Sequence, residues 1–202
     1  ETIPYDRNKP YNNLPLLPPD DKQVVTIEVL KALNSANKAL AELKGLARKL
    51  PNQSMLVNTI ALREAKASSE IENIFTTEDE LYKTLTAEES TINGNAKEVL
   101  RYREALWKGF NGIRNEGKFT IETLIKIYQV IQNVNDGIRP PQTETVIKKR
   151  GSGLLSGEVI YTPPRGKQII NEKLNNLIEY INDDNKYDYY IHIKLEVAQY
   201  QL

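Results

Sequence analysis

Apolar residues recur at intervals of three and four over most of the chain, which is the spacing of one face of an α-helix. From Val24 to Leu50 they alternate with lysines and glutamates, so this stretch is predicted to be a long amphipathic helix that Pro51 stops. A second helix is expected from about Ser54 to Asn73. The repeating apolar positions of the first helix are Val25, Val29, Ala32, Leu33, Ala36, Leu40, Leu43 and Ala47.

Capping signals and the same periodicity predict further helices downstream. Thr77 and Glu80 have capping-box spacing, in which each side chain accepts a hydrogen bond from the backbone amide of the other residue. A helix is therefore expected from Thr77 to about Leu85. The remaining predicted helices cover residues 96–110, 120–133, 171–181 and 189–202.

The pattern changes between Val146 and Thr162, where glycines interrupt the chain and the run from Glu158 to Thr162 is rich in β-branched and aromatic residues. Residues of these types favour a pleated strand. One β-hairpin on an otherwise helical protein is the simplest interpretation. The predicted fold class is therefore mainly α with a single hairpin.

The first 20 residues hold five of the ten prolines, and proline lacks the amide proton that helices and sheets use. This segment is predicted to be an extended arm that packs along another part of the protein. No internal repeat or low-complexity tract divides the chain. The polar stretch from Thr86 to Asn95 is the best candidate boundary, which separates an N-terminal helical region, 1–90, from a second region, 91–202.

Charge and targeting signals exclude several classes of partner. Lysine plus arginine and aspartate plus glutamate both count 27, so no net field attracts nucleic acid or an anionic membrane. No stretch has the roughly 20 apolar residues that span a bilayer, and residues 1–20 lack a secretory leader pattern. A cytoplasmic protein is expected.

The side chains available for catalysis are few. Cysteine is absent and His192 is the single histidine, so neither a Cys–His pair nor a multi-histidine metal site can be built. His192 is expected to be an ordinary surface or half-buried residue. The glycines at 151, 153 and 157 lack the lysine of a phosphate-binding loop and precede a strand, so they are expected to shape the hairpin.

Residues 68–73 have the sequence Ser-Ser-Glu-Ile-Glu-Asn. The four charged residues at 64, 66, 70 and 72 could simply form the solvated face of a helix. The same string, however, matches the inhibitory motif of Fic proteins, which is serine or threonine, three residues, glutamate, then glycine or asparagine. Ser68, Glu72 and Asn73 occupy its defined positions.

More of the chain resembles the Fic family, in the family's order. Residues 95–106 look like its early domain helix, 119–131 like the next helix, and Gly137-Ile138-Arg139 like the exit from that helix. The hairpin from Lys149 to Pro164 is similar to the family's flap. Residues 198–202 resemble the helix that enters the catalytic loop, His-Pro-Phe, two residues, Gly-Asn-Gly-Arg, which is expected after Leu202.

The resemblance implies a Fic-like helical bundle and a protein adenylyltransferase that transfers AMP from ATP to a serine, threonine or tyrosine hydroxyl of a target protein. ATP and Mg²⁺ are the implied cofactors, and a homodimer is compatible with the family. Because the loop histidine is the family's general base, no catalytic residue and no metal ligand is assigned here. Residues 1–202 alone are expected to be inactive.

Site residues follow from the resemblance. Glu72 is expected to occupy the space of the ATP γ-phosphate and to pair with a loop arginine, with Ser68 and Asn73 in supporting roles. Val159, Ile160 and Tyr161 are the candidate target contacts of the flap, through strand addition at its edge.

Two other interpretations stay open at this point. In one, the chain is a non-catalytic helical binding or regulatory module, with Glu72 merely solvated and the hairpin recognising a partner. In the other, it is a DNA-binding regulator, which the balanced charge and the lack of a basic stripe argue against.

Overall fold

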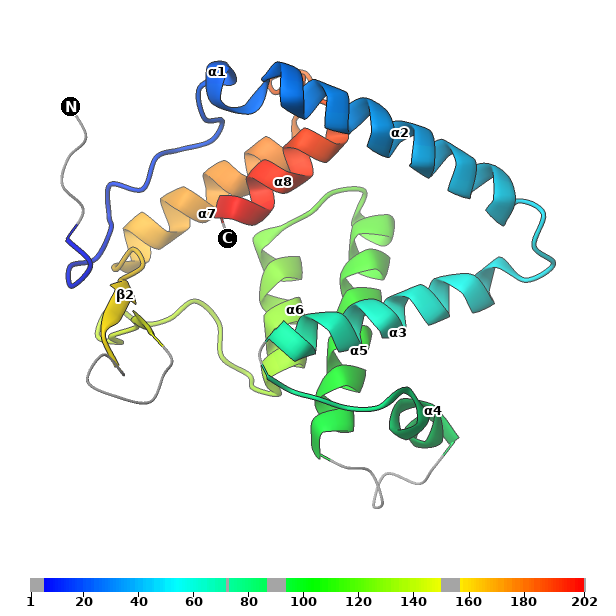
Figure 1. Ribbon diagram of the computed structural model, residues 1–202. Coiled ribbons are helices and arrows are strands. Elements are labelled where there is room, and N and C mark those ends of the chain that lie inside the picture. The colour runs from blue at the N-terminus through cyan, green and yellow to red at the C-terminus, as the bar shows by residue number, and fades with distance from the viewer. Residues whose placement is uncertain (1–5, 72, 87–93, 150–156, 202) are drawn as a thin grey trace. The chain divides into compact units, whose positions relative to one another are not determined.

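The computed structural model describes residues 6–71, 73–86, 94–149 and 157–201 (Figure 1). These residues form helices and one two-stranded antiparallel sheet, so the predicted fold class is confirmed. The elements are α1 (Asp21–Val24), α2 (Ile27–Ala47), α3 (Gln53–Ile71), α4 (Glu78–Thr86), α5 (Gly94–Glu116), α6 (Ile121–Gln132), β1 (Ile147–Lys148), β2 (Val159–Tyr161), α7 (Lys167–Asn182) and α8 (Ile191–Gln201).

The chain divides into two compact units, each of which is described by itself. One unit is Ile27–Asn135, and the other joins Glu1–Thr26 to Asp136–Leu202. The division of the sequence into regions 1–90 and 91–202 stays a prediction. None of the described helices has the length and apolar character that crossing a bilayer requires.

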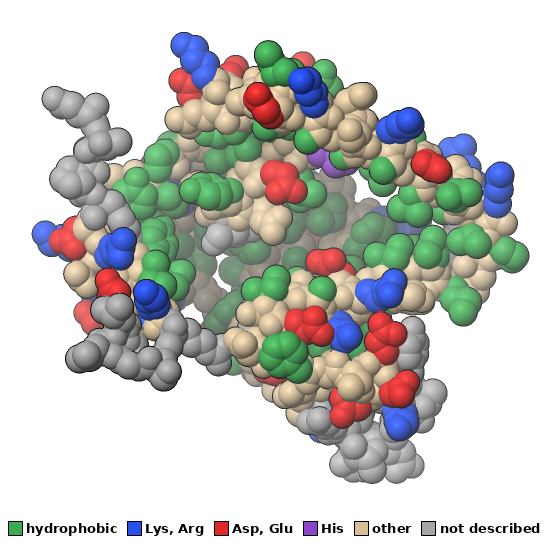
Figure 2. Space-filling model, viewed as in Figure 1, with side chains coloured by type: hydrophobic (Ala, Val, Ile, Leu, Met, Phe, Trp, Pro, Cys, Tyr) green, Lys and Arg blue, Asp and Glu red, His purple; other side chains and the backbone are tan. Residues whose placement is uncertain are grey.

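The long amphipathic helix predicted before Pro51 is α2, and the helix predicted after it is α3. Within α2 only Leu33 is buried, while Leu40 and Leu43 keep about half of their surface exposed, at 50% and 46%. Figure 2 shows apolar and charged side chains interspersed along this helix. Amphipathic spacing thus predicted the helix correctly, although most of its apolar positions remain exposed.

The core of the Ile27–Asn135 unit lies where α3, α4 and α5 meet. Leu62 and Ala65 of α3 pack with Leu81 of α4 and with Ala96 and Val99 of α5, and all five are at least 95% buried. The alanines let the helix backbones approach closely, and the leucines and valine fill the space that remains. The capping box positions α4 against this core.

The predicted capping box is present at the start of α4. The backbone N–H of Glu80 donates to Thr77 Oγ1 at 3.2 Å, and the N–H of Thr77 donates to Glu80 Oε2 at 3.0 Å. Each side chain therefore satisfies an amide that has no partner within the helix. Buried Thr76 adds a third bond, from its hydroxyl to the same carboxylate oxygen at 3.0 Å.

Helices α5 and α6 pack side by side as a hairpin (Figure 1). α5 continues to Glu116, past the predicted end at Phe110, and Gly117 with φ 71° allows the turn that follows. Thr120 caps α6 by accepting from the N–H of Thr123 at 3.1 Å, and left-handed Asn133 ends it. Both of these ends agree with the predicted helix 120–133.

In the other unit, α7 and α8 pack side by side (Figure 1) and enclose a cluster of aromatic residues. Tyr180 is fully buried, with the rings of Tyr187 and Tyr189 at 5.2 and 6.1 Å between centroids. Tyr189 also donates its hydroxyl to Asp21 of α1, and this bond, with burial, raises the pKa of Tyr189 to about 12. The short α1, capped by Asp20, was not predicted.

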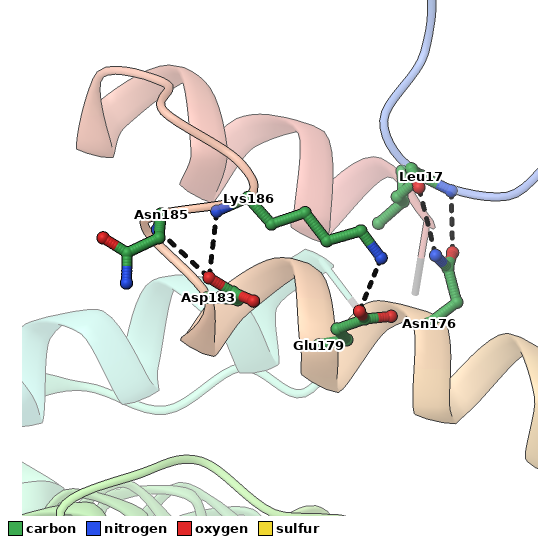
Figure 3. Close-up of polar contacts among 6 residues, drawn as sticks. All are labelled: Leu17, Asn176, Glu179, Asp183, Asn185 and Lys186. Carbon is green, nitrogen blue, oxygen red and sulfur yellow. Dashed lines mark hydrogen bonds and ion pairs between the residues drawn. The ribbon is translucent and has the colours of Figure 1, made fainter.

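The proline-rich arm packs against α7 and α8, as predicted for this segment. Leu17 is buried in the cluster that contains Leu177 and Ala198. The side-chain amide of Asn176 in α7 bonds both backbone groups of Leu17. Its Oδ1 accepts from the Leu17 N–H at 2.7 Å, and its Nδ2 donates to the Leu17 C=O at 3.0 Å (Figure 3). Near the chain end, Gln201 Nε2 donates to the C=O of Pro15 at 3.0 Å.

A polar turn joins α7 to α8. The carboxylate of Asp183 accepts from the backbone amides of Asn185 and Lys186 at 3.1 and 2.9 Å, which turns the chain back after the helix (Figure 3). Lys186 Nζ then contacts Glu179 Oε1 of α7 at 2.6 Å, and that pairing raises the pKa of Lys186. The side chains of Asp183, Lys186 and Glu179 therefore fix this turn, which follows the C-terminal end of α7.

The close approach of α5 and α6 predicts a difference between two glycines of α5. A Cβ at Gly109 would lie 2.7 Å from Ile127 Cδ1, whereas one at Gly112 would find ordinary contact with Thr123 Cγ2 at 3.6 Å. Both Gly→Ala changes gain up to about 1 kcal/mol of helix propensity, but overpacking at Gly109 costs about 1–3 kcal/mol. Urea unfolding should rank Gly112→Ala as the more stable variant; equal stabilities would contradict the packing described.

The double hydrogen bond of Asn176 predicts a stability loss that its neighbour does not share. Asn176→Ala removes both partners of Leu17 and should lower the free energy of unfolding by about 1–3 kcal/mol. Asn175→Ala changes the same residue type one position earlier on an exposed surface of α7 and should stay within about 0.5 kcal/mol of the wild type. Thermal or urea unfolding measures both; equal losses would contradict the role given to Asn176.

Candidate functional site

The predicted site residues fall in two places, one in each compact unit. Ser68 and Asn73 belong to the unit Ile27–Asn135, at the C-terminal end of α3, and Val159, Ile160 and Tyr161 form β2 in the other unit. Glu72, the expected inhibitory residue, lies outside the described residues.

The last turn of α3 combines one buried and several solvated polar residues. Ser69 is buried, whereas Ser68 is half-buried and its hydroxyl donates to Glu64 Oε1 at 3.4 Å, one turn earlier. Glu70 pairs with Lys66 at 3.6 Å between Oε1 and Nζ. These i,i+4 contacts stabilise the helix and leave Ser68 in an accessible position.

The end of α3 is a helix stop at Asn73. This residue has φ 62°, its N–H donates to the C=O of Glu70 at 3.0 Å, and the N–H of Ile74 donates to the C=O of Ser69 at 2.9 Å. Such bonds satisfy carbonyls that the helix leaves unpaired, and only glycine and asparagine adopt this left-handed geometry readily. The geometry explains physically why glycine or asparagine suits this position.

The segment after Asn73 is tied to the next helices. Asn95 Nδ2 at the start of α5 donates to the C=O of Phe75 at 2.9 Å, and Thr76 is buried beside the capping box of α4. Ile71 and Phe75 nevertheless expose 84% and 62% of their surface. The helix stop is therefore held in place by its surroundings, while the apolar residues around it face outward.

Val159, Ile160 and Tyr161 form a short strand that is partly exposed. Ile160 exposes 43% of its surface, and Val159 and Tyr161 are half-buried. β2 pairs with β1 in antiparallel register, Ile147 opposite Tyr161, with an irregularity next to Ile147.

Two mirrored sequences bracket this hairpin, Arg139-Pro140-Pro141 before it and Pro163-Pro164-Arg165 after it. Arg139 Nη2 donates to the C=O of Pro164 at 2.5 Å, and Arg165 Nε donates to the C=O of Pro141 at 2.8 Å. Each guanidinium satisfies a proline carbonyl of the opposite segment. These two arginines were not predicted to act as a pair, although the mirrored prolines are a sequence signal that points to one.

Among the described residues, neither a metal-binding cluster nor the histidine adds a functional group to the end of α3 or to β2. Within the ranges that the structure describes, no group of three or more His, Asp or Glu side chains is arranged to hold a metal ion. His192 is half-buried in the first turn of α8, and its Nδ1 is buried without a hydrogen-bond partner. His192 is distant from β2 in the sequence, and it was not predicted to be catalytic.

Residues 30–111 match the family described as Fic/DOC family N-terminal. This part of the chain is therefore similar to the N-terminal region of Fic/DOC proteins. The predicted resemblance to Fic proteins is thereby confirmed over these residues.

The Fic/DOC match begins in α2 and ends in α5, so it contains the whole of α3 and the motif at its end. It also contains the predicted early domain helix at 95–106. The hairpin lies outside the matched residues, and its assignment as a Fic flap stays a prediction, as do the roles of Ser68, Glu72 and Asn73.

The helix stop in the Fic region generates a prediction about Asn73. Because a left-handed backbone costs a residue with a Cβ about 1–2 kcal/mol, Asn73→Ala should destabilise the protein by about 1 kcal/mol, whereas Asn73→Gly should be neutral or stabilising. Asn133→Ala and Asn133→Gly are matched controls at the other left-handed helix end, φ 54°. Thermal unfolding compares the four; an alanine as stable as glycine at position 73 would contradict the geometry.

Proposed function

We propose that this protein is a Fic-family protein adenylyltransferase, which transfers AMP from ATP to a serine, threonine or tyrosine hydroxyl of a target protein, and that Glu72 inhibits it. The observation that carries the proposal is the match to the Fic/DOC N-terminal region, which encloses the string Ser68 to Asn73 at a helix stop. The motif therefore occurs at a helix end and within residues 30–111, which match the Fic/DOC N-terminal family.

In the proposed reaction, the target hydroxyl oxygen forms a bond to the α-phosphorus of ATP, and the bond to the pyrophosphate oxygen breaks. The hydroxyl proton passes to a base, which the family resemblance assigns to the histidine of the catalytic loop. Magnesium would accompany ATP and offset phosphate charge; none of the described residues is assigned to it. The contribution proposed for residues 1–202 is regulation and target alignment.

The proposed role of Glu72 has an electrostatic rationale. The C-terminus of a helix carries partial negative charge, so a carboxylate next to it is unfavourable by about 0.3–1 kcal/mol. The last turn of α3 has no basic residue, and the nearby Lys66 already pairs with Glu70. A carboxylate that follows Ile71 would therefore gain from pairing with a cation elsewhere, as an inhibitory contact with the loop arginine provides.

Inhibition would act through geometry. A carboxylate in the place of the γ-phosphate deflects the triphosphate, so the α-phosphate is not in line with the attacking hydroxyl. The residues that flank Glu72, Ile71 and Asn73, are both exposed, so the end of α3 is accessible to a charged group. Removing the carboxylate should restore the productive geometry.

Glu72→Gly in the full-length gene product should raise the incorporation of labelled AMP from ATP by about tenfold or more, since a charge-assisted contact is lost. Glu70→Gly is the matched control, because it removes a carboxylate two residues earlier from a helix-stabilising pair with Lys66. Its labelling should stay at the wild-type level.

Two results would count against the proposal. Equal activation by both substitutions would show that loosening α3, not removing the inhibitory carboxylate, raises the rate. Absence of labelling in the wild type and in Glu72→Gly alike would favour the non-catalytic binding module.

A further inference from the structure

The N-terminal arm is attached to the residue that follows β2. Thr162 is buried, and its Oγ1 donates to the C=O of Arg7 at 2.6 Å while its C=O accepts from the N–H of Tyr11 at 3.0 Å. Arg7 also pairs with Glu158, just before β2, at 3.6 Å between Nη1 and Oε1. The arm thus meets both ends of the strand.

Two further contacts continue this attachment along the chain. The ring of Tyr11 lies edge-on to that of Tyr161, with 6.5 Å between centroids, and Asn12 Oδ1 accepts from the N–H of Arg165 at 2.9 Å. The arm from Arg7 to Asn12 therefore follows the hairpin from Glu158 to Arg165. The Thr162–Arg7 bond joins residues 155 positions apart in sequence.

The described residues of the hairpin make few contacts with one another that could fix its orientation. Its strands contain two and three residues, and backbone bonds from Lys149 N–H to Glu158 C=O at 2.8 Å and from Gly157 N–H to Lys149 C=O at 3.2 Å close it. A two-stranded hairpin alone is marginally stable in water. Among the described residues, the contacts to the arm and the arginine bonds to Pro141 and Pro164 add to this support.

We propose that Thr162 and the arm segment Arg7–Asn12 form a positioning element, which holds β2 in one orientation for the backbone of the target protein. This inference rests on the proposed function, because the hairpin aligns a target only if the protein modifies one. Strand addition depends on a fixed edge, since main-chain bonds form only in register. A loosened hairpin would have to be ordered by the target itself, which weakens target binding and leaves the use of ATP unchanged.

Thr162 offers a matched pair of substitutions. Thr162→Val keeps the shape of the side chain and removes the donor to Arg7, whereas Thr162→Ser keeps the donor. Lys9→Ala is a control within the arm, because among the described residues Lys9 pairs with Asp6 of the same segment, at 3.4 Å. These variants thereby distinguish the effect of the Thr162 hydroxyl from the effects of side-chain volume and of charge in the arm.

The first measurement is amide hydrogen exchange of Lys149 and Gly157, whose N–H groups bond to Glu158 and to Lys149 within the hairpin. Thr162→Val should speed their exchange about five- to tenfold, and Thr162→Ser and Lys9→Ala should leave it at the wild-type rate. The Ile170 amide of α7, bonded to the C=O of Gly166 at 2.9 Å, should keep its rate and so exclude global unfolding. Unchanged exchange at Lys149 and Gly157 overturns the proposal, whatever the enzyme does.

The second measurement is kinetic, in the Glu72→Gly full-length background with labelled ATP and a library of ten-residue peptides that each carry one Ser, Thr or Tyr. Thr162→Val should raise KM for the best-labelled peptide about fivefold or more, with KM for ATP unchanged and with Thr162→Ser restoring the wild-type value. Faster exchange with an unchanged peptide KM would show a purely structural contact and overturn the positioning role. Absence of any labelling would instead refute the proposed function, while the exchange result still reports on the contact.

Discussion

The side-chain amide of Asn176 bonds both backbone groups of Leu17, and this contact attaches the N-terminal arm to α7. A segment rich in proline cannot pair its backbone in a helix or a sheet, yet its buried N–H and C=O groups still need partners. An amide side chain supplies one donor and one acceptor, as a neighbouring strand would. With Leu17 fixed in the aromatic cluster, residues 7–12 continue to the hairpin and bond Thr162.

Periodicity and capping chemistry predicted most helices because both are local properties. Thr77 with Glu80, and Thr120 with Asn133, mark helix ends through side chains that reach only a few residues. The missed boundaries lack such signals: α5 runs past Phe110 through polar residues on its exposed side, and α7 starts after Gly166, which offers no side-chain cap. Helix α1 has four residues, too few for a period to be recognised.

The features of the candidate site also differ in whether local sequence or long-range contacts determine them. The left-handed backbone of Asn73 follows from residue type, because few residues other than glycine and asparagine accept it. The bonds of Arg139 to Pro164 and of Arg165 to Pro141 join segments about 25 residues apart, and no periodicity specifies which carbonyl a guanidinium reaches. The attachment of Arg7 to Thr162 is longer still. Such contacts depend on the packed fold.

The two proposed roles of the chain are held by separate sets of contacts. The helix stop at Asn73 depends on bonds within the unit Ile27–Asn135, and the hairpin depends on the arm and the mirrored arginines within the other unit. The two sets share no residue. Under the proposed function, a change at the end of α3 would alter how the nucleotide is held, and a change at Thr162 would alter how the target is held.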